Sequence, residues 1–148
     1  TKDDGKLRSI PELDRIRPEF FQFGNVVPAY GIYSRHVKGL YLDNMVMSAE
    51  TPDNRPAVIC DDVIDVEIMD SKFSITSEAE CMIRFQNVQQ AWIRNCQLLG
   101  ANETFLQVEG KESKDILLSG NDLRKYEKSI SCINGATKDA VTTTSNIY

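Results

Sequence analysis

Three acidic residues are the candidates for catalytic chemistry in this sequence: Asp61, Asp62 and Glu109. Hydrolysis of a glycosidic bond with inversion needs a carboxylic acid and a carboxylate base whose carboxyl groups lie about 6.5–9.5 Å apart. Neighbouring strands of a sheet are ~4.8 Å apart, and residues i and i+2 of one strand are ~6.6 Å apart. Acids on one surface of a stacked fold can therefore reach this separation. An Asp at a corner also has a structural use, because its carboxylate bonds nearby backbone N–H groups.

Arginine side chains are the candidates for binding an acidic ligand. Arg35, Arg55 and Arg84 carry guanidinium groups, which bind carboxylates through two parallel hydrogen bonds. In an acidic protein such a contact requires a local basic patch. Ion pairs with the acids named above are the alternative interpretation of all three arginines.

His36 and Tyr30 complete the set of candidate substrate contacts. A turn or surface role is the other interpretation of His36, and the favoured one. Tyr30 belongs to an aromatic cluster with Phe20, Phe21 and Phe23. That cluster predicts either a loop packed on the side of the fold or one wall of a binding groove, because long excursions from a repeat scaffold often carry function.

A repeated pattern organises the chain around these candidates. Residues 31–47, 57–73, 82–98 and 105–123 are four copies of one pattern, and their starts lie 26, 25 and 23 residues apart. Aligned copies give four apolar columns: Ile32, Val58, Ile83 and Leu106; Leu40, Val66, Ala91 and Ile116; Leu42, Ile68, Ile93 and Leu118; and Met47, Phe73, Leu98 and Leu123. Short alternating runs with polar corners predict an all-β fold, a right-handed parallel β-helix of about four to five coils.

Other repeat architectures fit the copies less well. No helical period is present, which disfavours a helical solenoid, and the consensus of leucine-rich repeats is missing. A turn column of Asn44, Asp70 and Asn95, with Gly120-Asn121 in the fourth copy, supports the β-helix. Stacked amide side chains can hydrogen-bond from coil to coil.

The segments outside the copies predict a simple organisation. Residues 1–29 form an irregular segment packed on the side, in which Ser9 and Glu12 could cap a short helix. Residues 30–148 form the coils, with an excursion over residues 48–56 and a frayed or capping tail. An open end at Gly31 predicts self-association or further coils on that side.

Composition excludes several classes of protein. The 148 residues are 41% hydrophobic and carry a net charge of -5, which argues against nucleic acid and anionic membranes as partners. No apolar run approaches the ~20 residues of a membrane span. The four cysteines lack the close pairs of a zinc site, so we expect small buried hydrophobes, no metal and no cofactor.

Three short runs carry a resemblance to a known family. Pro28-Ala29-Tyr30-Gly31, Arg35-His36-Val37 and Arg55-Pro56-Ala57 resemble the carboxyl-terminal coils of polygalacturonase-like proteins of glycoside hydrolase family 28. The resemblance covers roughly residues 11–125. It implies a pectin-degrading β-helix, galacturonan or rhamnogalacturonan as substrate, and a secreted or periplasmic location.

The catalytic motifs of that family are absent from this sequence. They are Asn-x-Asp, an Asp-Asp pair, Gly-His-Gly and Arg-x-Lys, and only Asp61-Asp62 matches one of them formally. No catalytic residue is therefore carried over. We expect the carboxyl-terminal β-helix portion of such an enzyme, with the catalytic coils upstream of Thr1. A stand-alone carbohydrate-binding or structural β-helix is the alternative, and a trimeric adhesin or tailspike fragment is a third.

Overall fold

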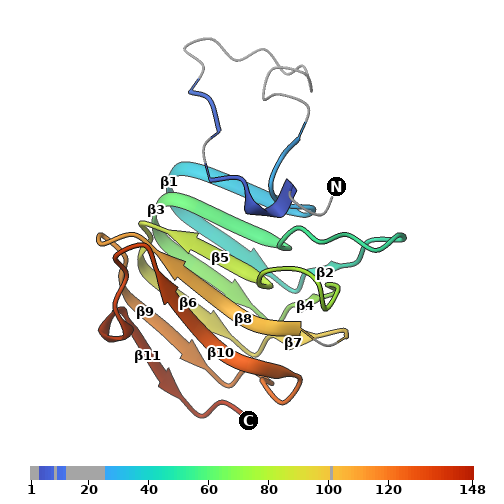
Figure 1. Ribbon diagram of the computed structural model, residues 1–148. Coiled ribbons are helices and arrows are strands. Elements are labelled where there is room, and N and C mark those ends of the chain that lie inside the picture. Colours follow the sequence, from blue (N-terminus) through green and yellow to red (C-terminus); the bar gives the residue numbers. More distant parts are fainter. Residues whose placement is uncertain (1–3, 9, 13–25, 101) are drawn as a thin grey trace.

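The computed structural model describes residues 4–8, 10–12, 26–100 and 102–148 as a right-handed parallel β-helix of four to five coils (Figure 1). Its regular elements are the short 3-10 helices η1 (Asp4–Lys6) and η3 (Lys138–Ala140) and the strands β1 (Ile32–Asp43), β2 (Val46–Met47), β3 (Val58–Met69), β4 (Lys72–Phe73), β5 (Ile83–Gln86), β6 (Gln89–Arg94), β7 (Gln97–Leu98), β8 (Asn102–Glu109), β9 (Lys114–Ser119), β10 (Tyr126–Ile133) and β11 (Val141–Thr144).

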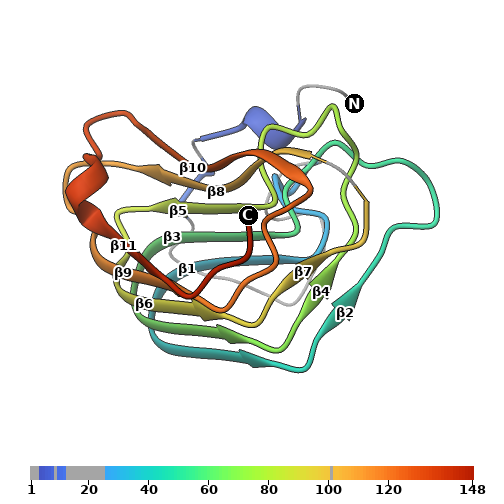
Figure 2. The same ribbon diagram turned by 90° about the horizontal axis from the view of Figure 1, so that it is seen from below.

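The coils enclose the core with three sides (Figure 2). The first face consists of residues 32–35, 58–61, 83–86, 106–109 and 130–133, paired in parallel. The second face consists of residues 40–43, 66–69, 91–94, 116–119 and 141–144. Strands β2, β4 and β7 form the third face. β1 and β3 continue around the corner between the first two faces, so these faces belong to one sheet.

The strand register confirms the apolar columns expected from the repeat. Ile32, Val58, Ile83 and Leu106 are successive partners on the first face. The columns that begin at Leu40 and Leu42 run through the second face as predicted. On the third face Met47 pairs with Phe73, and Phe73 with Leu98.

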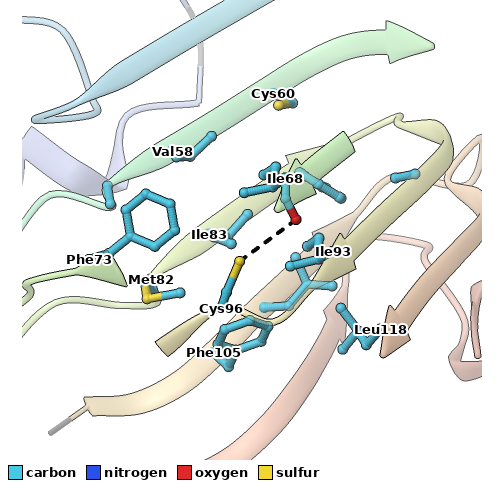
Figure 3. Packing of buried hydrophobic residues seen from close by; sticks show 14 of the residues in the cluster. Val58, Cys60, Ile68, Phe73, Met82, Ile83, Ile93, Cys96, Phe105 and Leu118 are labelled. Carbon is cyan, nitrogen blue, oxygen red and sulfur yellow. Dashed lines mark hydrogen bonds between the residues drawn. The ribbon is translucent and has the colours of Figure 1, made fainter. Parts of the chain in front are cut away.

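These columns meet inside the coils and form one apolar core (Figure 3). Ile68 is fully buried and has Leu42 and Ile93 as its partners in the neighbouring coils. Burial of such a side chain contributes roughly 1.5–3 kcal/mol to the free energy of unfolding. The thiol of Cys96 fills the same interior and lies 3.7 Å from the carbonyl oxygen of Ile68.

Each coil turns its corners with residues in the left-handed backbone region. One corner stacks His36, Asp62, Asn87, Gly110 and Asn134, and the next stacks Gly39, Asp65, Gln90 and Asp115. The third stacks Asn44, Asp70, Asn95, Gly120 and Ser145. Asn, Asp, His and Gly are the residue types that adopt a positive φ most readily. Except at Gln90 and Ser145, the corners are therefore occupied by the residue types that this backbone geometry favours.

Amide side chains link the coils at the third corner, as the turn column predicts. Asn95 donates to a carboxylate oxygen of Asp70 at 3.0 Å. The next position points inward, where buried Asn121 accepts from the Cys96 N–H at 3.0 Å and donates to the Ile93 carbonyl at 2.9 Å. Asn146 repeats this arrangement one coil later by donating to the carbonyl of Leu118 at 3.0 Å.

Outside the four copies, the structure differs in detail from what the sequence predicts. The tail from Tyr126 forms a fifth coil, in which β10 pairs with β8 and β11 pairs with β9. The helix expected at Ser9 is not present in residues 10–12, and Ser9 itself lies outside the described residues. Phe20, Phe21 and Phe23 also lie outside them.

The register makes Ile68 the most direct test of the stacked core. Replacing Ile68 with Ala should lower the free energy of unfolding by roughly 2–5 kcal/mol, because it removes buried apolar groups and leaves a cavity that the neighbouring side chains can fill only in part. Val46→Ala is the matched control, since Val46 is 68% exposed, and it should change stability by less than about 0.5 kcal/mol. Equilibrium denaturation measures both variants. A loss below about 1 kcal/mol for Ile68→Ala would mean that the register is wrong.

Candidate functional site

Two of the three candidate acids, Asp61 and Glu109, lie with two of the candidate arginines on the outward side of the first face. One outward column consists of Arg35, Asp61, Gln86 and Glu109. Asp61 and Glu109 are therefore two coils apart, which places their backbones about 9.6 Å from each other. This spacing is close to the upper end of the range for inverting hydrolysis. Proton donation also requires a carboxyl group that is available to a substrate.

Asp61 is the last paired residue of the first face in its coil and lies directly beside the corner residue Asp62. It is 6% exposed, and it accepts hydrogen bonds from Arg35 at 2.9 Å and from the Tyr33 hydroxyl at 3.1 Å. Burial, followed by the nearby charge of Asp61, raises the pKa of Tyr33 to about 12. The Arg35–Asp61 ion pair is the alternative that the sequence left open for Arg35. Both residues that contact the Asp61 carboxylate are hydrogen-bond donors, and both donate to the same oxygen, Oδ2.

Glu109 is more buried than Asp61, and its carboxylate accepts hydrogen bonds from more side chains. The residue is 2% exposed, and its carboxylate accepts from Arg8 at 3.0 Å, from Gln107 at 2.9 Å and from Asn134 at 2.9 Å. Burial opposes ionisation of this group, but the three hydrogen bonds favour it, and the net result is a lowered pKa. Glu109 is therefore ionised near neutral pH and is poorly suited to donate a proton.

An amino-terminal strap, residues 4–8 and 10–12, covers this outward side (Figure 2). Arg84 donates to the carbonyl oxygens of Gly5 at 2.6 Å and Leu7 at 2.7 Å. Arg8 bonds Glu80 at 2.6 Å in addition to Glu109. Farther along, Arg35 donates to the carbonyl of Ile10 at 2.8 Å. The strap thus contacts side chains of the first, third and fourth coils.

Burial on this face follows from the strap. Arg84 is 1% exposed although its side chain points away from the core. Desolvation and the neighbouring charge of Arg8 lower the pKa of Arg84. A Cβ on Gly5 would lie 2.8 Å from the carbonyl oxygen of Asn54 and 3.0 Å from the Cα of Arg55, so glycine permits the close approach. As placed, Arg84 offers no surface to an external sugar.

His36 and Asp62 stack at the corner beside this face. The Nδ1 atom of His36 lies 2.6 Å from an Asp62 carboxylate oxygen, and its Nε2 atom lies 3.0 Å from a Glu12 carboxylate oxygen. These hydrogen bonds, first to Glu12 and then to Asp62, raise the pKa of His36. The hydrogen bond to His36 lowers the pKa of Glu12. His36 thus joins the strap to the second coil in solvent.

Arg55 and Tyr30 lie away from the acids. Arg55 forms an ion pair with Asp53 at 2.6 Å and donates to the carbonyl of Val27 at 3.0 Å. The Tyr30 hydroxyl donates to the carbonyl of Ser74, and burial raises the pKa of Tyr30 to about 12. The structure therefore brings Arg35, Asp61, Arg84 and Glu109 onto one face, sets His36 and Asp62 at its corner, and separates Arg55 and Tyr30 from it.

Sequence reasoning missed the partners that complete this network. Arg8 precedes the repeat, and Glu80 lies in the loop between two copies. No periodic signal in the sequence indicates that Arg8 contacts Glu109 or that Glu80 contacts Arg84. Asn134 is different, because it stacks at the same corner as His36 and Asn87. Aligning the fifth coil with the other four would have revealed that position.

The cysteines and acids give no indication of a metal or redox centre in the part of the chain that the structure describes. Cys60, Cys81 and Cys96 are buried free thiols, and Cys132 is a partly buried one. Burial raises the pKa of Cys60 to about 12 and that of Cys96 to about 11, so these thiols stay protonated. Among the described residues no group of three or more His, Cys, Asp or Glu side chains is arranged to hold a metal ion.

Comparison with known proteins finds no match among family models, curated proteins or solved structures. Within the described residues, no helix is both long and apolar enough to span a membrane.

The His36 contacts predict a pH dependence of strap attachment. The pKa of His36 is raised above its ordinary 6.5, so its contribution is complete below that value and is lost as pH rises through the folded-state pKa. The pKa of Glu12 is lowered below its ordinary 4.5, so its contribution is lost as pH falls. Exchange of the backbone amides of Ile10 and Glu12, corrected for intrinsic rates, should show more protection at about pH 5.5 than at about pH 8.

His36→Gln is the control for this titration, because glutamine keeps hydrogen-bonding groups but has no charge change in this range. The variant should show equal corrected protection at both pH values. A pH difference that persists in His36→Gln would assign the effect to another group.

Proposed function

We propose that this chain is the carboxyl-terminal β-helix portion of a secreted or periplasmic polygalacturonase-like protein that acts on pectic polysaccharide. In this proposal the chain supports and binds the polysaccharide, and hydrolysis belongs to catalytic coils outside it. The repeat register and the three family-like runs support the assignment to this kind of protein. The resemblance supplies the class of substrate, galacturonan or rhamnogalacturonan.

The state of Asp61 and Glu109 is the observation that carries the non-hydrolytic role. These are the two candidate acids that stacking brings near the separation needed for inversion. Asp61 is occupied by Arg35 and Tyr33, and Glu109 is ionised and bonded to three donors. The strap lies over the same face. Asp62, the third candidate, is bonded to His36 at the corner.

A stand-alone carbohydrate-binding or structural β-helix is the second candidate. The strap favours this second candidate, because it covers the outward side of the first face and satisfies the buried charged groups there. The two candidates differ in the polypeptide that encodes them. The first requires the Asn-x-Asp, Gly-His-Gly and Arg-x-Lys motifs elsewhere in the same open reading frame, and the second does not.

The proposal predicts binding without hydrolysis by this chain alone. Incubation with polygalacturonate or rhamnogalacturonan should release no reducing ends above a heat-denatured control, because Asp61 and Glu109 are both held by hydrogen-bond donors and neither is available as an acid or a base. In the same samples, the polysaccharide should slow the migration of the protein in affinity electrophoresis. Reducing-end release that disappears in Asp62→Asn or Glu109→Gln would contradict the non-hydrolytic role.

A further inference from the structure

An exposed aromatic surface occupies the second face, on a different side of the molecule from the strap. The outward column there consists of Tyr41, Glu67, Trp92, Leu117 and Thr142. Tyr41 is 58% exposed and Trp92 is 38% exposed. The two rings are two coils apart, about 9.6 Å along the axis of the β-helix. Because the sheet is parallel and continuous here, both rings stand on one face.

Trp92 is held in place by two interactions. Its indole N–H donates to the Ser119 hydroxyl at 2.7 Å. The guanidinium carbon of Arg94 lies 4.7 Å from the centre of the indole ring, a cation–π contact. A ring that is already fixed loses little conformational entropy when a ligand stacks against it.

Arg94 differs from the other arginines in the described part of the chain. Arg8, Arg35, Arg55, Arg84 and Arg124 each have a carboxylate within ion-pair distance. For Arg94 the structure shows instead a contact with the sulfur of Met69 at 2.7 Å and a buried Nε atom without a hydrogen-bond partner. A guanidinium left without a carboxylate in a chain of net charge -5 is complementary to an external anion.

We propose that the surface formed by Tyr41, Glu67, Trp92 and Arg94 binds an extended acidic polysaccharide along the axis of the β-helix. The apolar face of a pyranose ring stacks on Trp92 or Tyr41, as flat rings do on exposed aromatic side chains. A uronate carboxylate pairs with Arg94, and sugar hydroxyls donate to Glu67. The ligand class rests on the proposed function, whereas the position of the site rests on the geometry of the second face.

The single tryptophan of the chain makes this surface directly observable. Titration of the whole protein with oligogalacturonate should change Trp92 fluorescence in a saturable, salt-sensitive way. Arg94→Gln should weaken binding roughly tenfold or more, as expected for loss of a charged hydrogen bond. Tyr41→Ala should also weaken it. Arg124→Gln and Tyr148→Ala are matched controls on exposed residues elsewhere and should bind like the parent protein.

The competing outcomes separate this inference from the proposed function. Suppose that pectic polysaccharide retards the protein in electrophoresis, but that Trp92 fluorescence does not change on titration and Arg94→Gln binds like the parent protein. The second-face site is then wrong and the proposed function stands. Equal binding of a neutral glucan, or of polyglutamate, would overturn the assignment of an acidic polysaccharide. If no polysaccharide binds by either method, both the site and the binding role fail.

Discussion

Each coil of this protein can bury its apolar side chains and pair its backbone groups only with the coils on either side of it. This constraint fixes the register, because a shift by one residue would turn every inward side chain of a strand outward. It also fixes the corners, since a coil whose corner geometry differed from its neighbours would lose the pairing of the strands that follow. The three stacks of left-handed residues and the inward amides of Asn121 and Asn146 are consequences of that requirement.

The same stacking aligns outward side chains into columns, and there the chemistry of the two large faces diverges. On the first face, Arg84 and Glu109 are charged groups removed from water. Buried ions are costly unless they are fully bonded, and the strap supplies Arg8 and the carbonyls of Gly5 and Leu7 for this purpose. Acids that could have served catalysis are thereby committed to structure. On the second face, Trp92 is exposed and Arg94 is partly exposed.

The part of the fold that depends on periodicity could be predicted from the sequence. Alternating apolar residues placed Ile68 between Leu42 and Ile93, and the recurring Asn and Asp placed the third corner. A turn was also expected at Asp61-Asp62, and a turn or surface role was one interpretation of His36, whereas the corner at Gly39 and Asp65 was not anticipated. The pair Asp61-Asp62 interrupts an apolar run and so indicated a turn there, and Asp62 is the residue of the pair with a positive φ.

The candidate site was less predictable, for a physical reason. The burial of Arg84 and Glu109 is caused by the strap, which lies outside the repeat and reaches them from 77 and 101 residues away in the sequence. A contact of that kind leaves no periodic signal in either segment. The Arg35–Asp61 pair could be anticipated as one of two interpretations, because the repeat aligns these residues in adjacent coils.

A double-mutant cycle between Arg8 and Glu109 tests most directly whether the strap lies across the first face and commits its acids. The cycle compares the free energies of unfolding of the parent protein, Arg8→Ala, Glu109→Ala and the double variant, with Arg124 in place of Arg8 as a control. The contact at 3.0 Å predicts a favourable coupling of about 1 kcal/mol or more, and none for Arg124. Coupling of Arg8 with Glu109 indistinguishable from zero would contradict the account.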